Sequence, residues 1–241
     1  MKKLIVANWK MNPASQRDAE YLFGLVKKGV AELKEVQVVI CPPFVFLPFL
    51  KGLILGAQNV FYKESGAFTG EISPSQLIDL EVEYVIVGHS EARKYLNESD
   101  ELINKKIKEC LKEKLIPILC VGENTGEEKS VVLEKQITEG LKDVYHEHAK
   151  KVVVAYEPVW AIGTGKNCSI KETVSSISLI KKVISNLYSS EVADNVRILY
   201  GGSVNSENSC FYIKETGVNG LLVGGASLDA QEFIKIVKSA I

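Results

Sequence analysis

Three side chains suited to proton transfer follow short apolar runs in widely separated parts of the chain. Lys10 follows LIVANW, His89 follows YVIVG, and Glu157 directly follows VVVAY. A carboxylate beside apolar surface is costly unless it is paired or used in catalysis. Taken singly, each residue also has a simpler structural interpretation, because strand-end lysines are mostly surface residues and partly buried acids and histidines are often paired. Together they predict an acid–base site if the fold brings them close.

The residues around His89 and Glu157 add to this prediction. Ser90 and Glu91 indicate a helix start after His89, and a helix amino end favours a neutral ring that donates a hydrogen bond from its N–H. After Glu157, Pro158 stiffens the chain, 159–162 form an apolar body, and 163–165 read Gly-Thr-Gly. We expect a lid with two hinges that excludes water above the carboxylate, although an ordinary loop has the same ingredients.

Paired glycines occur in YGGSV at 200–204 and in VGGAS at 223–227, each after a β-rich run. One such pair is most simply a tight turn, but two at successive strand ends favour a phosphate monoester held by backbone N–H groups. The formal net charge of −1 gives no general attraction to nucleic acid or to an anionic membrane. Any anion site must therefore be local.

Eight short β-rich runs span the whole sequence, and their apolar residues are continuous rather than alternating. This is typical of parallel strands that are covered on both faces. The runs are LIVANW at 4, VQVVIC at 36, LILGAQ at 53, YVIVG at 84, IPILC at 116, VVVAYE at 152, VRILYG at 196 and GLLVG at 220.

Segments with helical spacing lie between these runs. Ser15 with Asp18, and Ser99, indicate capped helix starts. Two apolar stripes are each expected on one helix face: Leu102, Ile103, Ile107, Cys110 and Leu111, and Ile170, Val174, Ile177, Ile180, Val183, Ile184 and Leu187. The order β then α recurs about eight times without a linker, and no GxGxxG follows the first run, so we predict a single (β/α)8 barrel over 1–241 rather than an open doubly wound sheet.

Composition places this barrel among soluble proteins of a reducing compartment. The 241 residues are 46% hydrophobic and 24% charged, and the most apolar stretch, at 41–57, is broken by three prolines and Lys51. Neither an export signal nor a membrane span is expected, which predicts a cytoplasmic protein. The five cysteines show no CxxC pair, and His146 and His148 would point to different sides of a helix, so we expect free thiols and no metal.

Seven segments resemble the triosephosphate isomerase family in order and spacing along nearly the whole chain: ANWKMN, GAFTGEIS, VGHSEAR, LCVGE, AYEPVWAIGTGK, YGGSV and GLLVGGASL. The resemblance implies interconversion of dihydroxyacetone phosphate and glyceraldehyde 3-phosphate, a step of glycolysis and gluconeogenesis, without a cofactor. It implies that Glu157 moves the carbon proton, that His89 polarises the substrate oxygens, that Lys10 stabilises the enediolate and that Asn8 orients the oxygens. A desolvated carboxylate is the stronger base, which gives Glu157 a reason to lie beside apolar surface.

The same resemblance assigns the surrounding residues. Main-chain N–H groups of four residues would bind phosphate: Gly163, Ser203, Gly224 and Gly225. Residues beside the site or in its lid would be Glu91, Cys120, Pro158, Trp160 and Tyr200, with Tyr200 and Ser203 holding the closed lid. The long loop at 61–73 would reach a second subunit through Phe68, Thr69 and Glu71, with Thr69 near the partner chain's Asn8, which predicts a homodimer.

One position departs from the family pattern, because HSERR is replaced here by HSEAR with alanine at 92. The missing arginine would neutralise Glu98 and Glu71, so we expect both acids to lack their usual partner. Other phosphate-binding barrels, such as a sugar-phosphate epimerase, and a noncatalytic phosphate-binding barrel remain alternatives. The lid sequence beside HSE weighs against the first, and intact Lys10, His89 and Glu157 weigh against the second.

Overall fold

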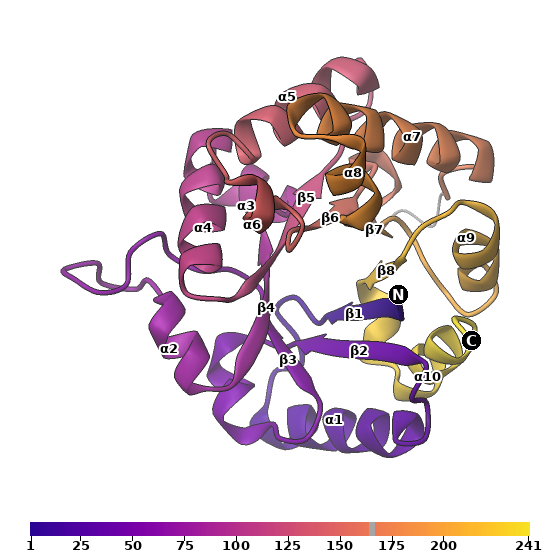
Figure 1. Cartoon of the computed structure of the whole chain (residues 1–241). Helices are drawn as coiled ribbons and strands as arrows, with labels where there is room; N and C mark the ends of the chain where they lie inside the picture. Colours follow the sequence, from indigo (N-terminus) through magenta and orange to yellow (C-terminus); the bar gives the residue numbers. More distant parts are fainter. Residues whose placement is uncertain (164–166) are drawn as a thin grey trace.

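The computed structural model of the chain describes residues 1–163 and 167–241. Eight parallel strands close into a barrel in sequence order, and the eighth pairs with the first (Figure 1). They are β1 (Lys3–Asn8), β2 (Val36–Cys41), β3 (Ile54–Ala57), β4 (Val82–Val87), β5 (Ile116–Val121), β6 (Val153–Tyr156), β7 (Arg197–Tyr200) and β8 (Gly220–Val223). Every predicted strand is present, and the predicted (β/α)8 barrel is confirmed.

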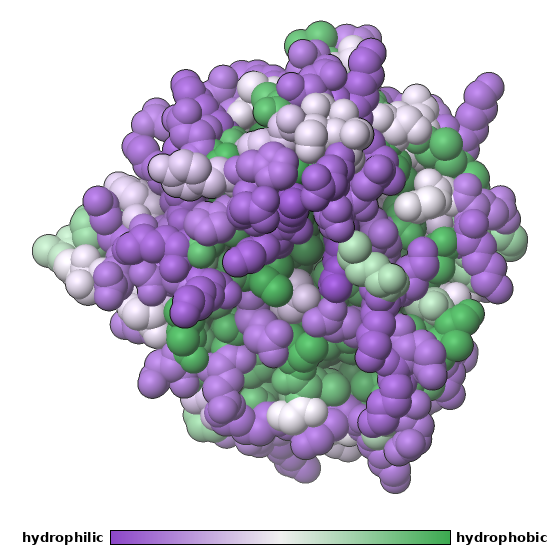
Figure 2. Space-filling view, in the orientation of Figure 1, coloured by the Kyte–Doolittle hydropathy of each residue, from purple (hydrophilic) through white to green (hydrophobic). Residues whose placement is uncertain are grey.

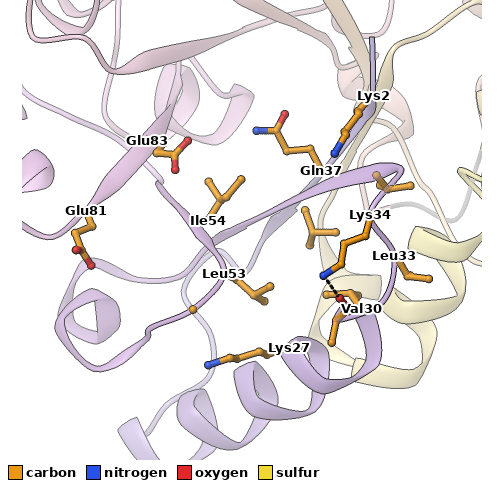
Figure 3. A pocket seen from close by; sticks show the side chains of 14 residues that line it. Lys2, Lys27, Val30, Leu33, Lys34, Gln37, Leu53, Ile54, Glu81 and Glu83 are labelled. Carbon is orange, nitrogen blue, oxygen red and sulfur yellow. Dashed lines mark hydrogen bonds between the residues drawn. The ribbon is translucent and has the colours of Figure 1, made fainter.

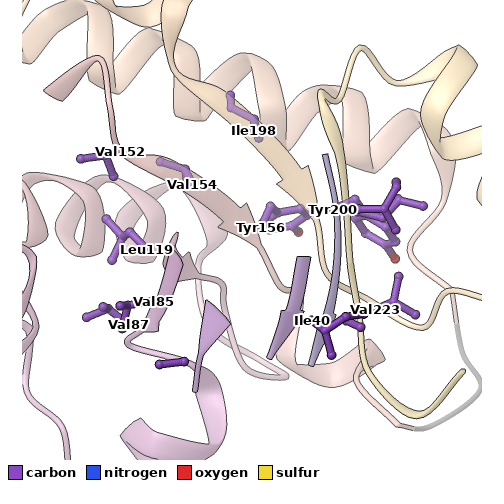
Figure 4. Packing of buried hydrophobic residues seen from close by; sticks show 14 of the residues in the cluster. Ile40, Val85, Val87, Leu119, Val152, Val154, Tyr156, Ile198, Tyr200 and Val223 are labelled. Carbon is purple, nitrogen blue, oxygen red and sulfur yellow. The ribbon is translucent and has the colours of Figure 1, made fainter. Parts of the chain in front are cut away.

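The continuous apolar runs arise because both faces of each strand are buried. Successive side chains point to opposite faces, so Leu4 and Val6 fill the barrel interior while Ile5 and Ala7 pack outward against helices. Figure 4 shows part of the outer layer, including Tyr156 on β6. Burial of both layers favours a closed barrel, which leaves no apolar strand face to water.

Helices cover the outside of the barrel. The α-helices are α1 (Gln16–Val30), α2 (Pro74–Asp79), α3 (Ser90–Tyr95), α4 (Asp100–Lys112), α5 (Lys129–Gly140), α6 (His146–Ala149), α7 (Ile170–Leu187), α8 (Ser190–Asn195), α9 (Ser209–Glu215) and α10 (Ala230–Lys238). Three 3-10 helices are η1 (Phe44–Phe49), η2 (Val159–Ala161) and η3 (Gly225–Leu228). The predicted starts of α1 and α4 are confirmed, because Ser15 and Ser99 accept hydrogen bonds from Asp18 and Leu102 N–H groups. None of the described helices has the length and apolarity needed to cross a bilayer.

The apolar stripe predicted for α7 is only partly buried. Ile177, Ile180 and Ile184 are in the core, but Val174 and Leu187 are 38% and 39% exposed. Two polar residues, Thr173 and Ser176, take buried places instead, and their hydroxyls donate to carbonyls four residues earlier at 3.0 and 2.9 Å. Hydroxyls satisfied in this way can be buried at little cost, so an apolar count alone misplaces the face.

The long connection between β3 and α2 projects from the barrel (Figure 1). Phe61 N–H donates to Ile72 C=O at 2.8 Å and closes the base of this projecting loop, which spans 61–73. Near its tip, Phe68 packs on the Phe61 ring with centroids 4.7 Å apart and stays 40% exposed. The loop therefore presents an aromatic side chain away from its own barrel.

Glu98 lacks the arginine that the family pattern places at 92, but it has other partners. Buried Lys106 of α4 forms an ion pair with Glu98 Oε1, and Asn59 Nδ2 donates to the same oxygen at 2.9 Å. Lys106 Nζ also donates to Asn59 Oδ1 at 2.8 Å, which closes a three-residue network. Of the two carboxylate oxygens of Glu98, Oε2 is buried and has no hydrogen-bond partner among the described residues. Glu71, the second of the two acids, is exposed on the projecting loop.

Replacing Lys106 by methionine should lower the free energy of unfolding by about 3 kcal/mol, because Glu98 would be left buried and unpaired. Urea-induced unfolding followed by circular dichroism measures this. The neighbouring Lys105→Met is the matched control, since Lys105 pairs with Glu101 at the exposed surface, and it should leave the midpoint unchanged. Equal effects of the two variants would show that the buried network does not stabilise the fold.

Ala92→Arg tests whether an arginine can stabilise Glu98 Oε2, the oxygen that the network leaves without a partner. The Glu98 nitrogen lies 3.4 Å from the Ala92 carbonyl oxygen, so an arginine at 92 starts close to the backbone of Glu98, whose Oε2 has no partner among the described residues. We expect the midpoint of thermal unfolding to rise by a few degrees. An unchanged or lower midpoint would mean that Lys106 and Asn59 already compensate in full.

Candidate active site

A cavity of about 190 Å³ lies at the carboxyl ends of the strands. It brings together eight of the residues singled out in the sequence: Asn8, Lys10, His89, Glu157, Gly163, Ser203, Gly224 and Gly225. Ile162, Gly201, Gly202, Val204, Leu222 and Ala226 complete its lining. Its polar side chains thus come from the ends of β1, β4, β6 and β7, as the closed barrel requires.

Glu157 is held with its carboxylate out of water. It is 3% exposed, and its backbone N–H donates to Val121 C=O of β5 at 2.8 Å. Two glycines make room for it, because a Cβ on Gly122 would lie 1.8 Å from the Glu157 carbonyl oxygen and one on Gly201 2.8 Å from Glu157 Cγ. Oε2 has no hydrogen-bond partner among the described residues, so one oxygen is available to a ligand proton.

His89 is the N-cap of α3, and the helix orients its ring. Nδ1 accepts a hydrogen bond from the Glu91 backbone N–H at 3.2 Å, and Nε2 lies 3.2 Å from Glu157 Oε1. An accepting Nδ1 carries no proton, so this geometry fits the neutral ring with its hydrogen on Nε2. The predicted neutral, donating imidazole agrees with these contacts.

The pKa of His89 moves against that prediction while Glu157 is charged beside it. Burial lowers the pKa of His89, and so does Lys10, but the Glu157 carboxylate raises it most strongly and Glu91 adds to the rise. The net direction is upward. The helix end alone therefore does not set the charge of this ring, because the charge also depends on whether Glu157, the acid in contact with it, is ionised.

Lys10 is fixed in the cavity by its own backbone and by neighbouring side chains. Its φ is +53°, a left-handed conformation that non-glycine residues rarely adopt. The Lys10 N–H donates to Asn8 Oδ1 at 3.0 Å, and its carbonyl accepts from Gln58 Nε2 at 2.8 Å. Nζ forms an ion pair with Glu91 Oε1 at 2.5 Å. Asn8 and Gln58, at the ends of β1 and β3, thus fix the backbone of Lys10, and Glu91 fixes its ammonium group.

The segment after Glu157 is anchored by a buried acid. Glu123 is 4% exposed and accepts hydrogen bonds from Trp160 Nε1 at 3.0 Å and from the Tyr156 hydroxyl at 3.2 Å. Its carbonyl also accepts from the Val159 N–H at 3.0 Å. Pro158 and Trp160 therefore stand behind the cavity rather than in its lining, and they fix the first end of the predicted lid.

Two stacked tyrosines hold the chain at Cys168, beyond the predicted lid. Tyr200 and Tyr212 lie with ring centroids 4.0 Å apart and an interplanar angle of 17°. The Tyr200 hydroxyl accepts from the Cys168 N–H at 3.3 Å, and the Tyr212 hydroxyl donates to the Cys168 carbonyl at 2.6 Å. The two remaining hinge positions of the prediction, Thr164 and Gly165, lie outside the described residues.

Other predicted residues lie next to the cavity without lining it. Cys120 is buried at the end of β5, where burial, and then the charge of Glu157, raise the pKa of its thiol well above the usual range. Glu91 reaches the site only through Lys10 and the His89 ring.

Phe68, Thr69 and Glu71 belong to the projecting loop. No set of three or more His, Cys, Asp or Glu side chains within 1–163 and 167–241 is arranged to hold a metal ion.

Sequence reasoning gave no role to Glu123, Gln58 or Leu222. Gln58 ends the third β-rich run in GAQ, and Glu123 follows the fifth in LCVGE, so a polar residue at a strand end was the available signal for both. Leu222 gave no signal of its own, since an apolar residue inside a strand looks the same whether it faces a cavity or the core.

Comparison with known proteins gives one consistent result. A family model described as triosephosphate isomerase matches residues 3–240. A triosephosphate isomerase of Dictyoglomus thermophilum is 45% identical and is aligned over 99% of each chain, and one of Alkaliphilus oremlandii is 45% identical over 98% of each. A third, of Clostridium tetani, is 42% identical over 98% of this chain and 96% of its own.

Glu157→Gln should lower the pKa of His89. The wild-type carboxylate holds this pKa above its usual range, whereas an uncharged amide leaves burial and Lys10, which both lower it. NMR titration of the ring nitrogens of His89 measures the shift, with exposed His146 in the same spectra as an internal reference. An unchanged or higher pKa in the variant would show that Glu157 does not control the charge of the ring.

Proposed function

The chain belongs to the triosephosphate isomerase family, and from this premise we infer that it interconverts dihydroxyacetone phosphate and D-glyceraldehyde 3-phosphate. One observation carries the assignment of that chemistry to particular residues. The carboxylate of Glu157, the imidazole of His89 and the ammonium of Lys10 line a single cavity of a size suited to a few-atom ligand. All three relatives carry the same name, and nothing among them favours an epimerase or a noncatalytic barrel.

Glu157 is the proposed base. It takes the proton from the carbon next to the substrate carbonyl, and the C–H electron pair becomes the double bond of an enediolate. The resulting carboxylic acid then returns the proton to the neighbouring carbon, while the hydroxyl proton of the first substrate oxygen is lost and the second oxygen gains one, which completes the isomerisation without a change in overall composition. The 3% exposure of Glu157 supports this role, because a carboxylate deprived of water gains more from taking up a proton.

His89 and Lys10 are proposed to stabilise the negative oxygens. Nε2–H of His89 can donate to both oxygens in turn, and Lys10 supplies a fixed positive charge, with Asn8 oriented beside it. Once Glu157 has taken up the carbon proton, it no longer carries the charge that raises the pKa of His89. The negative charge then lies on the enediolate oxygens, which Lys10 can stabilise and to which the neutral His89 ring can donate from Nε2–H.

The phosphate is proposed to lie at the end of the cavity formed by Gly163, Ser203, Gly224 and Gly225. A Cβ on Gly163 or Gly225 would meet nothing within 4 Å, so backbone there borders open space that a ligand can fill. A Cβ on Gly224 would lie 3.4 Å from Lys10 Cε, which places this backbone beside the lysine. Backbone N–H groups in such a loop bind a dianion without needing a net positive protein.

Closure of the segment from Pro158 to Gly163 is proposed to exclude water while the enediolate exists. The buried acceptor Glu123 is suited to hold the start of that segment through Trp160, and the Tyr200–Tyr212 pair is suited to hold the chain further on, at Cys168. Without such a cover, the enediolate would be exposed to water and could lose its phosphate.

A homodimer is proposed from the projecting loop and its surroundings. Phe68, Thr69 and Glu71 are exposed on that loop. Exposed apolar side chains also occur in the connections after β1, β2 and β4: Met11, Val45, Tyr95 and Leu96. Apolar surface gathered on neighbouring loops is typical of an interface, and a second copy would cover it. A glycolytic enzyme of this kind is further proposed to work in the cytoplasm, without a cofactor.

Glu157→Gln should lower kcat for isomerisation by about 10³-fold with little change in KM, because the amide cannot accept the carbon proton. A coupled spectrophotometric assay measures both constants. Glu147→Gln, at an exposed site on α6, is the control and should match the wild type. A Glu157→Gln enzyme with near wild-type kcat would remove the proposed base from the mechanism.

Phe68→Asp should convert the dimer to a monomer, because it places a charge where the proposed interface requires an apolar contact. Sedimentation equilibrium measures the mass. Phe211→Asp on α9 is the matched control, since Phe211 is 54% exposed and lies away from the projecting loop. A wild-type protein of monomer mass, or a Phe68→Asp variant that stays dimeric, would contradict this interface.

A further inference from the structure

One unit of the barrel has no α-helix. Between the end of β2 at Cys41 and the start of β3 at Ile54, the described residues 42–53 form only the 3-10 helix η1. Every other strand is followed by at least one α-helix (Figure 1). A (β/α)8 barrel normally covers each strand pair with such a helix, whereas here the short η1 covers the outer side of β2 and β3 with Phe46 and Leu47.

The sequence of this connection explains the missing helix. Pro42, Pro43 and Pro48 lack N–H groups, and Pro48 lies inside η1, where an α-helix would need that donor. Gly52 has a φ of +95°, which ends any helical continuation before β3.

The consequence is an open groove at the amino ends of the strands. A cavity of about 960 Å³ lies between the C-terminal part of α1 and the first residues of β2, β3 and β4. Half-buried Leu33, Leu53 and Ile54 form its floor together with buried Val36. Figure 2 shows apolar surface in this hollow with hydrophilic side chains around it. The groove lies at the opposite end of the strands from Glu157.

The two rims of the groove carry opposite charges. Lys27 of α1 and Lys34 just after it stand on one side, where their ammonium groups donate to the Lys51 and Ala31 carbonyls. Glu81, just before β4, and Glu83, near its start, stand on the other side (Figure 3). Glu81 forms an exposed ion pair with Lys51 at 3.0 Å, and Lys2 also lines the groove. The glutamates would repel a simple anion, and the lysines would repel a simple cation. The two rims together therefore suit a partner surface that carries both positive and negative charges.

We propose that this groove, with its apolar floor and oppositely charged rims, is the docking site for an amphipathic helix of a partner protein. The partner helix takes the place that the β2–β3 connection leaves open, with its apolar face on Leu33, Leu53 and Ile54. Acidic residues on one flank face Lys27 and Lys34, and basic residues on the other face Glu81 and Glu83. An added strand does not fit, because β3 is already paired on both sides with β2 and β4.

Three synthetic helical peptides of about 14 residues, some four turns, test the proposal. All share one leucine face, and they differ only in their flanks: glutamates on one and lysines on the other, glutamates on both, or lysines on both. Titration with the full-length protein, followed by fluorescence anisotropy, should give a Kd for the mixed peptide about tenfold lower than for either of the others. Equal affinities, or no binding of any peptide, would overturn the proposal.

Two protein variants make the test specific to the groove. A double variant, Glu81→Lys with Glu83→Lys, makes both rims positive and should transfer the preference to the all-glutamate peptide. Leu53→Asp should abolish binding of all three, because it places a charge in the apolar floor. Isomerase activity should be unchanged in each variant. Unaltered peptide binding by Leu53→Asp would place the peptide elsewhere and overturn the assignment.

Discussion

The exclusion of water from the Glu157 carboxylate is the constraint on which the site depends. The side chain is 3% exposed, and its contacts include the His89 ring on one oxygen, while the other oxygen has no hydrogen-bond partner within the described part of the chain. A charged carboxylate buried in this position lowers the stability of the fold, but it is useful for proton transfer. The glycines at 122 and 201 and the apolar segment after Pro158 all serve to keep it there.

The groups around this carboxylate are positioned by strand ends and helix starts rather than by long flexible loops. His89 caps α3, and Lys10 is held in a left-handed conformation by Asn8 and Gln58. Each position is costly in isolation but is fixed by a closed barrel whose two apolar layers are buried. The fold therefore supplies rigidity at one end of its strands, while the groove at the other end reflects a unit in which helix formation is blocked by proline.

Much of the fold follows from local sequence. Continuous apolar runs gave all eight strands, and Ser15 and Ser99 marked helix starts, because strand burial and capping depend on neighbouring residues. The interior of the barrel at Leu222 and the roles of Gln58 and Glu123 did not follow, since each depends on residues far apart in the sequence. The partnership of Glu98 with Lys106 spans only eight positions, so its distance in the sequence does not explain why it was missed. A lysine is also normally predicted to lie at the surface, although Lys106 is buried. The charge state of His89 is a further case, because it depends on an acid 68 positions away (157 − 89).

Hydrogen exchange at carbon tests the central claim most directly. Dihydroxyacetone phosphate is converted by the protein in heavy water, and the deuterium content of each product carbon is read by NMR. If Glu157 carries the proton between the two carbons, the product must hold carbon-bound deuterium wherever the acid has exchanged with solvent before returning its proton, and Glu157→Gln must leave the substrate unlabelled. Labelling at the wild-type rate in that variant would show that another group moves the proton.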